Sequence, residues 1–147
     1  RNDKMSGLSR FLKKNKVQKQ NAKYAATRSL VDEDGKPLEW ELRPLSTRES
    51  EQIRIACSME VPVTGKPGQY RQKLDSAKYI VKMLAAAVVY PDLQNAELQD
   101  SYGVTDPEDL LYEMIDNPGE FNDLAAFVQQ YSGLDETMEE KVQEAKN

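Results

Sequence analysis

The chain has 147 residues, a length typical of one domain, and 39% of them are hydrophobic, slightly fewer than in most globular domains. It contains no His and a single Cys, which excludes histidine-based acid/base catalysis, Ser or Cys–His triads and zinc sites that contain His. A lone Cys cannot close a disulfide within the chain, and the first residues lack the apolar core of a secretory signal. We therefore expect a soluble, cytoplasmic protein.

Charge is distributed unevenly along the chain, whose formal net charge is −5 at pH 7. Residues 1–28 carry nine Lys or Arg and one acid, whereas residues 91–147 carry two bases and fifteen acids. Ends of opposite charge are typical of interaction tails and of chains whose ends attract each other or the ends of neighbouring copies. The charge pattern alone identifies no partner; we expect the protein to associate with itself.

Residues 1–23 are rich in Lys, Asn and Gln and are predicted to form a basic N-terminal arm. The spacing of Leu8, Phe11 and Leu12 would place all three on one face of a helix. The arm could be a solvated segment ordered only in part, a short helix that docks on a partner or sister subunit, or a nucleic-acid-binding arm. The third interpretation is the weakest, because Phe11 is the only aromatic residue of the arm and the acidic half of the chain would repel phosphate. We predict that Leu8, Phe11 and Leu12 form a partner-docking site.

Residues 24–134 are predicted to form a single α+β domain that is mostly helical and opens with a β-hairpin at about 24–43. Strand-like runs at 24–31 and 38–42 flank residues 32–37, whose three acids and one Gly favour a turn. In the second run Leu38, Trp40 and Leu42 alternate with charged residues, so one face of the strand is apolar. We expect this face to pack through Trp40 on a bundle of about five helices.

The first helix is expected over about residues 46–59, because Ser46 and Glu49 match a capping box. Its predicted inner side comprises Ile53, Ala56 and Cys57. We interpret Cys57 as a small buried side chain rather than a nucleophile, since no recognisable arrangement of residues would lower the pKa of its thiol.

Residues 61–74 contain two Pro and two Gly and are predicted to be a loop. Asp75 can cap the next helix, which is expected to continue to about Tyr90, before Pro91. From residue 79 onward this segment is apolar almost all round, so we expect it to be the buried central helix of the fold.

Three further helices are expected: one at about 95–102, and two that open at Asp106 and Asn117, each an N-cap followed by Pro. The predicted inner faces of these last two helices comprise Leu110, Leu111, Met114 and Ile115, and Phe121, Leu124, Ala125, Val128 and Tyr131. Residues 135–147 are predicted to be an acidic C-terminal helix or tail.

The carboxylates show neither a paired arrangement nor the spacing of metal ligands. We therefore predict that the protein is not an enzyme and name no catalytic, cofactor-binding or metal-binding residue. The longest apolar run is shorter than the roughly 20 residues that cross a bilayer, so no membrane partner is expected. Nucleic acid is not expected either, because a DNA-binding regulator needs a basic recognition helix inside the fold, whereas the positive charge is concentrated before residue 29.

Several stretches resemble one known family. They are residues 8–16 (LSRFLKKNK), 24–31 (YAATRSLV), 35–40 (GKPLEW), 60–63 (EVPV), 65–70 (GKPGQY), 88–93 (VVYPDL), 96–104 (AELQDSYGV) and 117–122 (NPGEFN). Together they are similar to the XkdN-like phage tail assembly chaperones, found in phages and defective prophages of Gram-positive bacteria. The resemblance covers about residues 8–136.

The resemblance implies a non-enzymatic assembly factor in the cytoplasm of a bacterial host. Such a chaperone is expected to bind the tape-measure protein, to keep its apolar helices soluble, and to help bring tail tube protein to it. No cofactor is implied. The alternative is a structural or regulatory prophage protein that acts through protein contacts, and a DNA-binding regulator is a weaker one.

Overall fold

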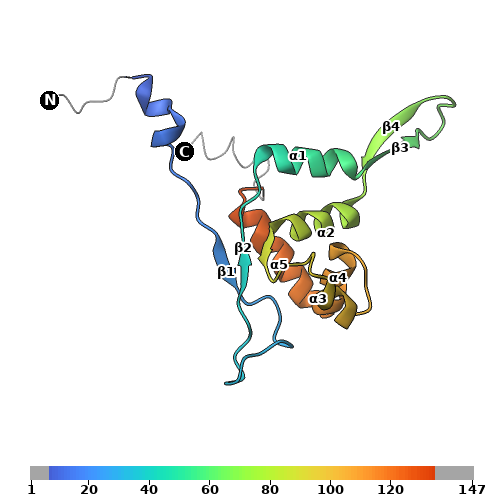
Figure 1. The fold of residues 1–147 in the computed structure, drawn as a ribbon. Helices are drawn as coiled ribbons and strands as arrows, with labels where there is room; N and C mark the ends of the chain where they lie inside the picture. Colours follow the sequence, from blue (N-terminus) through green and yellow to red (C-terminus); the bar gives the residue numbers. More distant parts are fainter. Residues whose placement is uncertain (1–6, 135–147) are drawn as a thin grey trace.

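The computed structural model describes residues 7–134, which form an α+β fold dominated by helices (Figure 1). The α-helices of this part of the chain are α1 (Thr47–Ala56), α2 (Ser76–Ala87), α3 (Ala96–Ser101), α4 (Pro107–Met114) and α5 (Pro118–Tyr131). The strands are β1 (Ala22–Tyr24), β2 (Trp40–Leu42), β3 (Ser58–Pro62), β4 (Tyr70–Leu74) and β5 (Val88–Tyr90). The predicted fold class is confirmed. The predicted acidic segment 135–147 and the first six residues of the predicted arm lie outside the described residues.

β1 and β2 form the predicted N-terminal hairpin, with Tyr24 opposite Trp40 and Ala22 opposite Leu42 in an antiparallel ladder. The Trp40 side chain is only 2% exposed and Leu42 is fully buried. The prediction that this face packs on the helices is therefore confirmed for Trp40 and Leu42. It is wrong for Leu38, which lies outside β2 and is exposed. Both strands are shorter than the predicted runs 24–31 and 38–42.

The chain leaves the ladder after β1 because α5 offers it other hydrogen-bond partners. Oγ1 of the buried Thr27 donates to Oε1 of Glu120 at 2.7 Å, and the backbone N–H of Arg28 donates to Oε2 at 2.9 Å. Both bonds lower the pKa of Glu120, and the bond from the Arg28 N–H has the larger effect. Residues 27–28 are thus held at the start of α5 instead of extending the strand.

β5 forms where the sequence predicts the last turn of a helix. α2 ends at Ala87, and Val88 lies opposite Leu42 on the free edge of β2, in the sheet order β1-β2-β5. The backbone N–H of Arg43 donates to the carbonyl of Ala87 at 2.9 Å. Unpaired edge groups on β2 and β-branched side chains at Val88 and Val89 favour strand pairing over another helical turn. The predicted helix end near Tyr90 is therefore wrong.

α2 is the central helix of the fold, as predicted. It contacts α1, α4, α5 and β5, and four of its side chains belong to the buried core: Val81, Met83, Leu84 and Ala87. All four predicted core residues of α4 and its end are buried, and α5 contributes Leu124, Ala125 and Val128. Burial of this kind contributes about 25 cal/mol per Å² of apolar surface, so the packing of α2, α4 and α5 together with Trp40 and Leu42 of β2 stabilises the fold.

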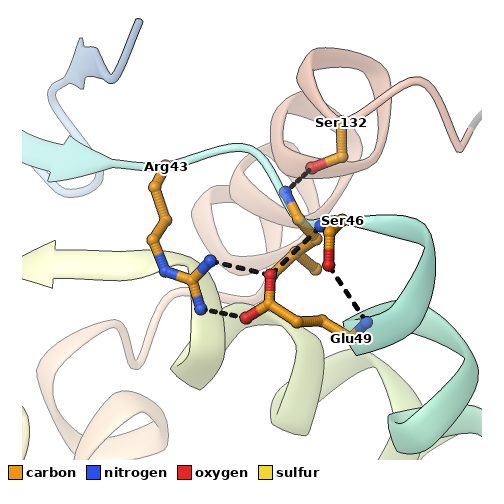
Figure 2. A network of polar contacts seen from close by, with 5 residues as sticks. Arg43, Ser46, Glu49 and Ser132 are labelled. Carbon is orange, nitrogen blue, oxygen red and sulfur yellow. Dashed lines mark hydrogen bonds and ion pairs between the residues drawn. The ribbon is translucent and has the colours of Figure 1, made fainter. Parts of the chain in front are cut away.

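α1 begins with the predicted capping box (Figure 2). The N–H of Glu49 donates to Oγ of Ser46 at 3.2 Å, and the N–H of Ser46 donates to Oε1 of Glu49 at 3.1 Å. The guanidinium of Arg43 also binds both oxygens of the Glu49 carboxylate. Close by, the backbone N–H of Leu45 donates to Oγ of Ser132 at 2.9 Å, which ties the connection between β2 and α1 to the end of α5.

α1 ends at Ala56, three residues earlier than predicted, because the chain turns at Cys57 into β3. Cys57 is buried, in agreement with its interpretation as a small core side chain. Ile53 is half-buried, but Ala56 is exposed and its predicted inner position is wrong. An open groove between α1 and α2, described below, separates Ala56 from the core.

Residues 58–74 form a second antiparallel hairpin, β3–β4, and the predicted loop at 61–74 is wrong. The pairing extends from Ser58 opposite Leu74 to Pro62 opposite Tyr70. Gly65 and Gly68 adopt φ values of +77° and +81°, which L side chains rarely adopt, and so permit the tight connection between the strands. The hairpin extends away from the helices at the end of the α1–α2 pair (Figure 1).

Candidate interaction surfaces

The predicted docking residues lie on two short turns rather than one α-helix. Ser9–Phe11 and Lys13–Asn15 are separate 3-10 turns, because Leu12 between them is extended, at φ −66° and ψ 148°. Leu8 is 76% exposed, Phe11 86% and Leu12 44%. The three apolar side chains are therefore available for contact, and their docking role stays a prediction. From here the arm denotes residues 7–20.

The base of the arm is attached to the end of α5 and to β2. Lys19 donates to the carbonyl of Tyr131 and lies 4.3 Å from the centre of its ring, and the Tyr131 hydroxyl donates to the carbonyl of Gln20. Asn21 and Lys23 donate to the two carboxylate oxygens of Glu41 at 2.7 and 3.1 Å. Both contacts lower the pKa of Glu41, and the hydrogen bond from Asn21 has the larger effect. These contacts fix where the arm leaves the domain, while residues 10–20 are all exposed.

The opposite end of α5 lies in a strongly acidic region. Residues 91–134 contain ten Asp or Glu and no Lys or Arg. At the start of α4, Asp106 is the N-cap and accepts from the N–H of Asp109 at 2.8 Å. A hydrogen bond with Asp106 and repulsion from Asp106, Glu108 and Glu113 raise the pKa of Asp109. The region therefore favours cationic partners.

Within this acidic region, a small hollow lies between α4 and α5, with a volume of about 300 Å³. We call it the α4–α5 pocket. It is lined by Tyr112, Ile115, Asp116, Pro118, Phe121 and Asn122. The rings of Tyr112 and Phe121 are stacked, with centroids 5.3 Å apart, and Tyr112 is substantially exposed. The pocket thus combines an apolar, aromatic wall with a carboxylate.

A second set of exposed apolar side chains lies on α1 and on both faces of the β3–β4 hairpin, and we call this set the hairpin surface. Its exposed side chains are Ile55, Met59 and Tyr70. The register places Met59 and Val61 on one face of the hairpin and Tyr70 on the other. Both faces are solvated, because the hairpin extends beyond the helices.

A groove lies between α1 and α2. None of its lining residues belongs to the β3–β4 hairpin, and the one nearest to it in the chain is Ala56, the last residue of α1. The volume of the groove is about 470 Å³, and its apolar lining includes Ile53 and Ala56 from α1 and Ala85 and Ala86 from α2. Lys82 and Glu108, 3.1 Å apart, border it, and this contact raises the pKa of Lys82. Small side chains along such a groove allow the backbone of a partner to approach closely.

Neither a metal site nor a membrane span is found in the part of the chain that the structure describes. No group of three or more Cys, Asp or Glu side chains in residues 7–134 is placed to hold a metal ion. No helix of the same range is long and apolar enough to cross a membrane. The surfaces described above are therefore the candidate functional features.

Sequence reasoning found the arm but missed the α4–α5 pocket, the hairpin surface and the groove between α1 and α2. Tyr112 carries no motif, and its stacking on Phe121 depends on the turn between two helices. Met59 and Tyr70 fall in a predicted helix end and a predicted loop. One signal was present: Met59, Val61 and Val63 recur with a period of two, which is typical of a strand.

Comparison with known proteins establishes the family. The model of the family "Phage XkdN-like tail assembly chaperone protein, TAC" matches residues 8–146, so the chain belongs to this family and the resemblance seen in the sequence is confirmed. Tail assembly chaperones work with protein partners and are generally not enzymes.

Two relatives from Bacillus subtilis (strain 168) match nearly their whole length. The phage-like element PBSX protein XkdN is 22% identical over all of this chain and 98% of its own. The uncharacterized protein YqbN is 21% identical over 99% of this chain and 97% of its own. A crystal structure of the protein YqbN superposes with a TM-score of 0.71 and 18% identity over 90% of this chain and 100% of that one, which supports the same fold.

Proposed function

We propose that this chain binds the tape-measure protein of its phage or prophage during tail assembly, through the hairpin surface and the groove between α1 and α2. Tape-measure proteins are expected to be long, helical and apolar-faced, and an uncoated protein of this kind would aggregate. A chaperone that covers those faces with many weak contacts would keep the client soluble. Assembly would take place in the cytoplasm of the bacterial host, with tail tube protein as a further partner.

The exposed apolar side chains of the hairpin surface, on α1 and the β3–β4 hairpin, are the observation that carries this proposal. Ile55, Met59 and Tyr70 are solvated although the fold has a well-buried core elsewhere. Met is flexible and polarizable and suits surfaces that contact many sequences. An amphipathic client helix laid in an apolar groove is a recurrent mode of peptide recognition. The hairpin surface and the groove therefore fit an apolar helix that varies in sequence along its length.

Co-expression tests the proposal. The tape-measure protein encoded with this chain should move from the insoluble to the soluble fraction, and the two should copurify with several chaperone copies per client. The double variant Met59→Ser with Tyr70→Ser should lose most of this effect. The matched control Val31→Ser with Leu38→Ser alters two exposed apolar side chains in the β1–β2 connection and should retain it.

Two results would overturn the proposal. One is a tape-measure protein that stays insoluble with no complex recovered at low salt, which would favour the structural or regulatory alternative. The other is equal loss of solubilisation in the variant and its control, which would remove the hairpin surface from the argument. A mobility shift with DNA that persists at moderate salt would instead support a DNA-binding regulator.

A further inference from the structure

The arm carries both cationic and apolar side chains, and its own domain does not bury the apolar ones. Residues 7–20 carry five Lys or Arg and no acid. Phe11 and Leu8 are the most exposed members of the predicted docking site. Exposed aromatic side chains beside cationic groups are typical anchors of protein interfaces.

The α4–α5 pocket has the complementary chemistry. It presents the stacked Tyr112 and Phe121 rings and the Asp116 carboxylate, within a stretch of ten acids and no bases. Tyr112 also borders a neighbouring hollow lined by four carboxylates and two lysines: Asp75, Asp106, Glu108, Asp109, Lys78 and Lys82. Lys82 is paired with Glu108, so Asp106 and Asp109 are the carboxylates at the start of α4 that an incoming cation would meet. An incoming peptide that buries an aromatic ring here would have carboxylates on both sides for its Lys and Arg side chains.

A copy's own arm and pocket lie at opposite ends of α5. The arm is attached at Tyr131, the last residue of the helix, whereas Pro118 at its first turn lines the pocket. Fourteen residues of α-helix span roughly 20 Å. The arm also leads away from α4 rather than toward it (Figure 1).

We propose that the arm of one copy docks on the α4–α5 pocket of a second copy, with Phe11 against Tyr112 and Phe121 and the flanking cations near Asp116. Donor and acceptor are different surfaces at different ends of the domain. The contact is therefore head-to-tail and can repeat from copy to copy in an open chain. This inference is independent of the client, because it uses neither the hairpin surface nor the groove.

Sedimentation velocity of the full chain over a range of concentrations provides the first test. Self-association should strengthen with concentration and weaken as salt rises from about 0.1 to 1 M, because surface charges are screened. Phe11→Glu should weaken it by about tenfold or more, as expected for an interface anchor. Val17→Glu is the matched control: Val17 is equally exposed on the arm but lies outside the docking site, so the effect should stay within about twofold.

The pocket is tested in the same way with Asp116→Lys, and with Tyr112→Ala as a second variant that adds no charge. Each should weaken self-association, whereas Glu33→Lys, an exposed charge reversal in the β1–β2 connection, should not. Thermal melting of each variant verifies that it is folded.

Mixing two defective copies distinguishes head-to-tail docking from other modes of association. Phe11→Glu retains an intact pocket, and Asp116→Lys retains an intact arm, so each should be mainly monomeric alone. Mixed together they should form a one-to-one dimer, in which the arm of Asp116→Lys docks on the pocket of Phe11→Glu. The dimer should grow no further, because its remaining arm and its remaining pocket are both defective. Three results would overturn the proposal: a wild-type chain that is monomeric at every concentration, association that Phe11→Glu leaves unchanged, or a mixture that stays monomeric.

Discussion

The molecule contains two antiparallel hairpins of opposite character. β1–β2 places Trp40 and Leu42 in the core and gains a third strand, β5, on its free edge. β3–β4 has five paired positions, more than β1–β2, yet leaves most of its side chains solvated. An isolated two-stranded ribbon is marginal in water, so β3–β4 depends on the helices at its base. Backbone pairing alone thus does not decide which hairpin stabilises the fold; the burial of side chains does.

The largest expected effect comes from removing the anchor of the first hairpin. Trp40→Ala should lower the free energy of unfolding by about 3–5 kcal/mol, because it empties a large volume in the core. Urea denaturation measures this value. Tyr70→Ala in the second hairpin should change it by less than about 0.5 kcal/mol, since Tyr70 is 62% exposed. Equal losses in the two variants would contradict the comparison.

A smaller effect is expected at the exit of β2, where Arg43 binds Glu49. The hydrogen bonds from the Arg43 guanidinium are the main cause that lowers the pKa of Glu49 from 4.5 to about 2. The contact therefore stabilises the folded chain above about pH 4.5, and its contribution is lost as the pH falls toward 2.

Glu49→Gln should accordingly lower the free energy of unfolding at pH 7 by about 1–2 kcal/mol, a figure that allows for solvent screening of this half-exposed pair. Between pH 4.5 and 2 the variant should lose less stability than the wild type, as urea denaturation at several pH values can show. Glu60→Gln on β3 is the control for the second hairpin and should leave stability unchanged. If the stability of Glu49→Gln falls with pH as steeply as that of the wild type, the contact between Arg43 and Glu49 is not the cause of the wild-type loss between pH 4.5 and 2.

The smallest effect should be confined to the second hairpin. Gly68→Ala places a Cβ at φ +81° and should destabilise the turn by about 1 kcal/mol. Amide hydrogen exchange in β3 and β4 should become about fivefold faster, while exchange in α2 and the melting temperature of the fold stay the same. A large fall in melting temperature would show that β3–β4 is part of the cooperative core.

Local chemistry made much of the fold predictable from the sequence. Four helix starts were predicted at Ser46, Asp75, Asp106 and Asn117, and each of these side chains accepts a hydrogen bond from the first turn of its helix. Such caps act within three residues, so a single sequence contains all the information they need. The alternation around Trp40 likewise indicated which face of β2 is buried.

Features that depend on distant pairing were not predictable in this way. Val88 joins a sheet because Leu42, far earlier in the chain, offers a free edge. The sequence at Val88 is compatible with the end of a helix as well as with a strand. The candidate sites differ in the same way. The exposure of Phe11 could be predicted because the neighbouring residues in the sequence are polar and charged. The pocket at Tyr112 could not, because it forms only when α4 and α5 pack together.

The contacts of Tyr131 have a consequence for the order of events during synthesis. Its hydroxyl binds the carbonyl of Gln20, a residue 111 positions earlier. The ribosome must therefore complete α5 before the arm can be oriented, whereas pairs such as α4 and α5 are close in sequence and can meet soon after they emerge. We expect the nascent chain to lack the contacts of Lys19 and Gln20 with Tyr131 until α5 folds, so that the arm reaches its final direction only when these contacts join those of Asn21 and Lys23 with Glu41.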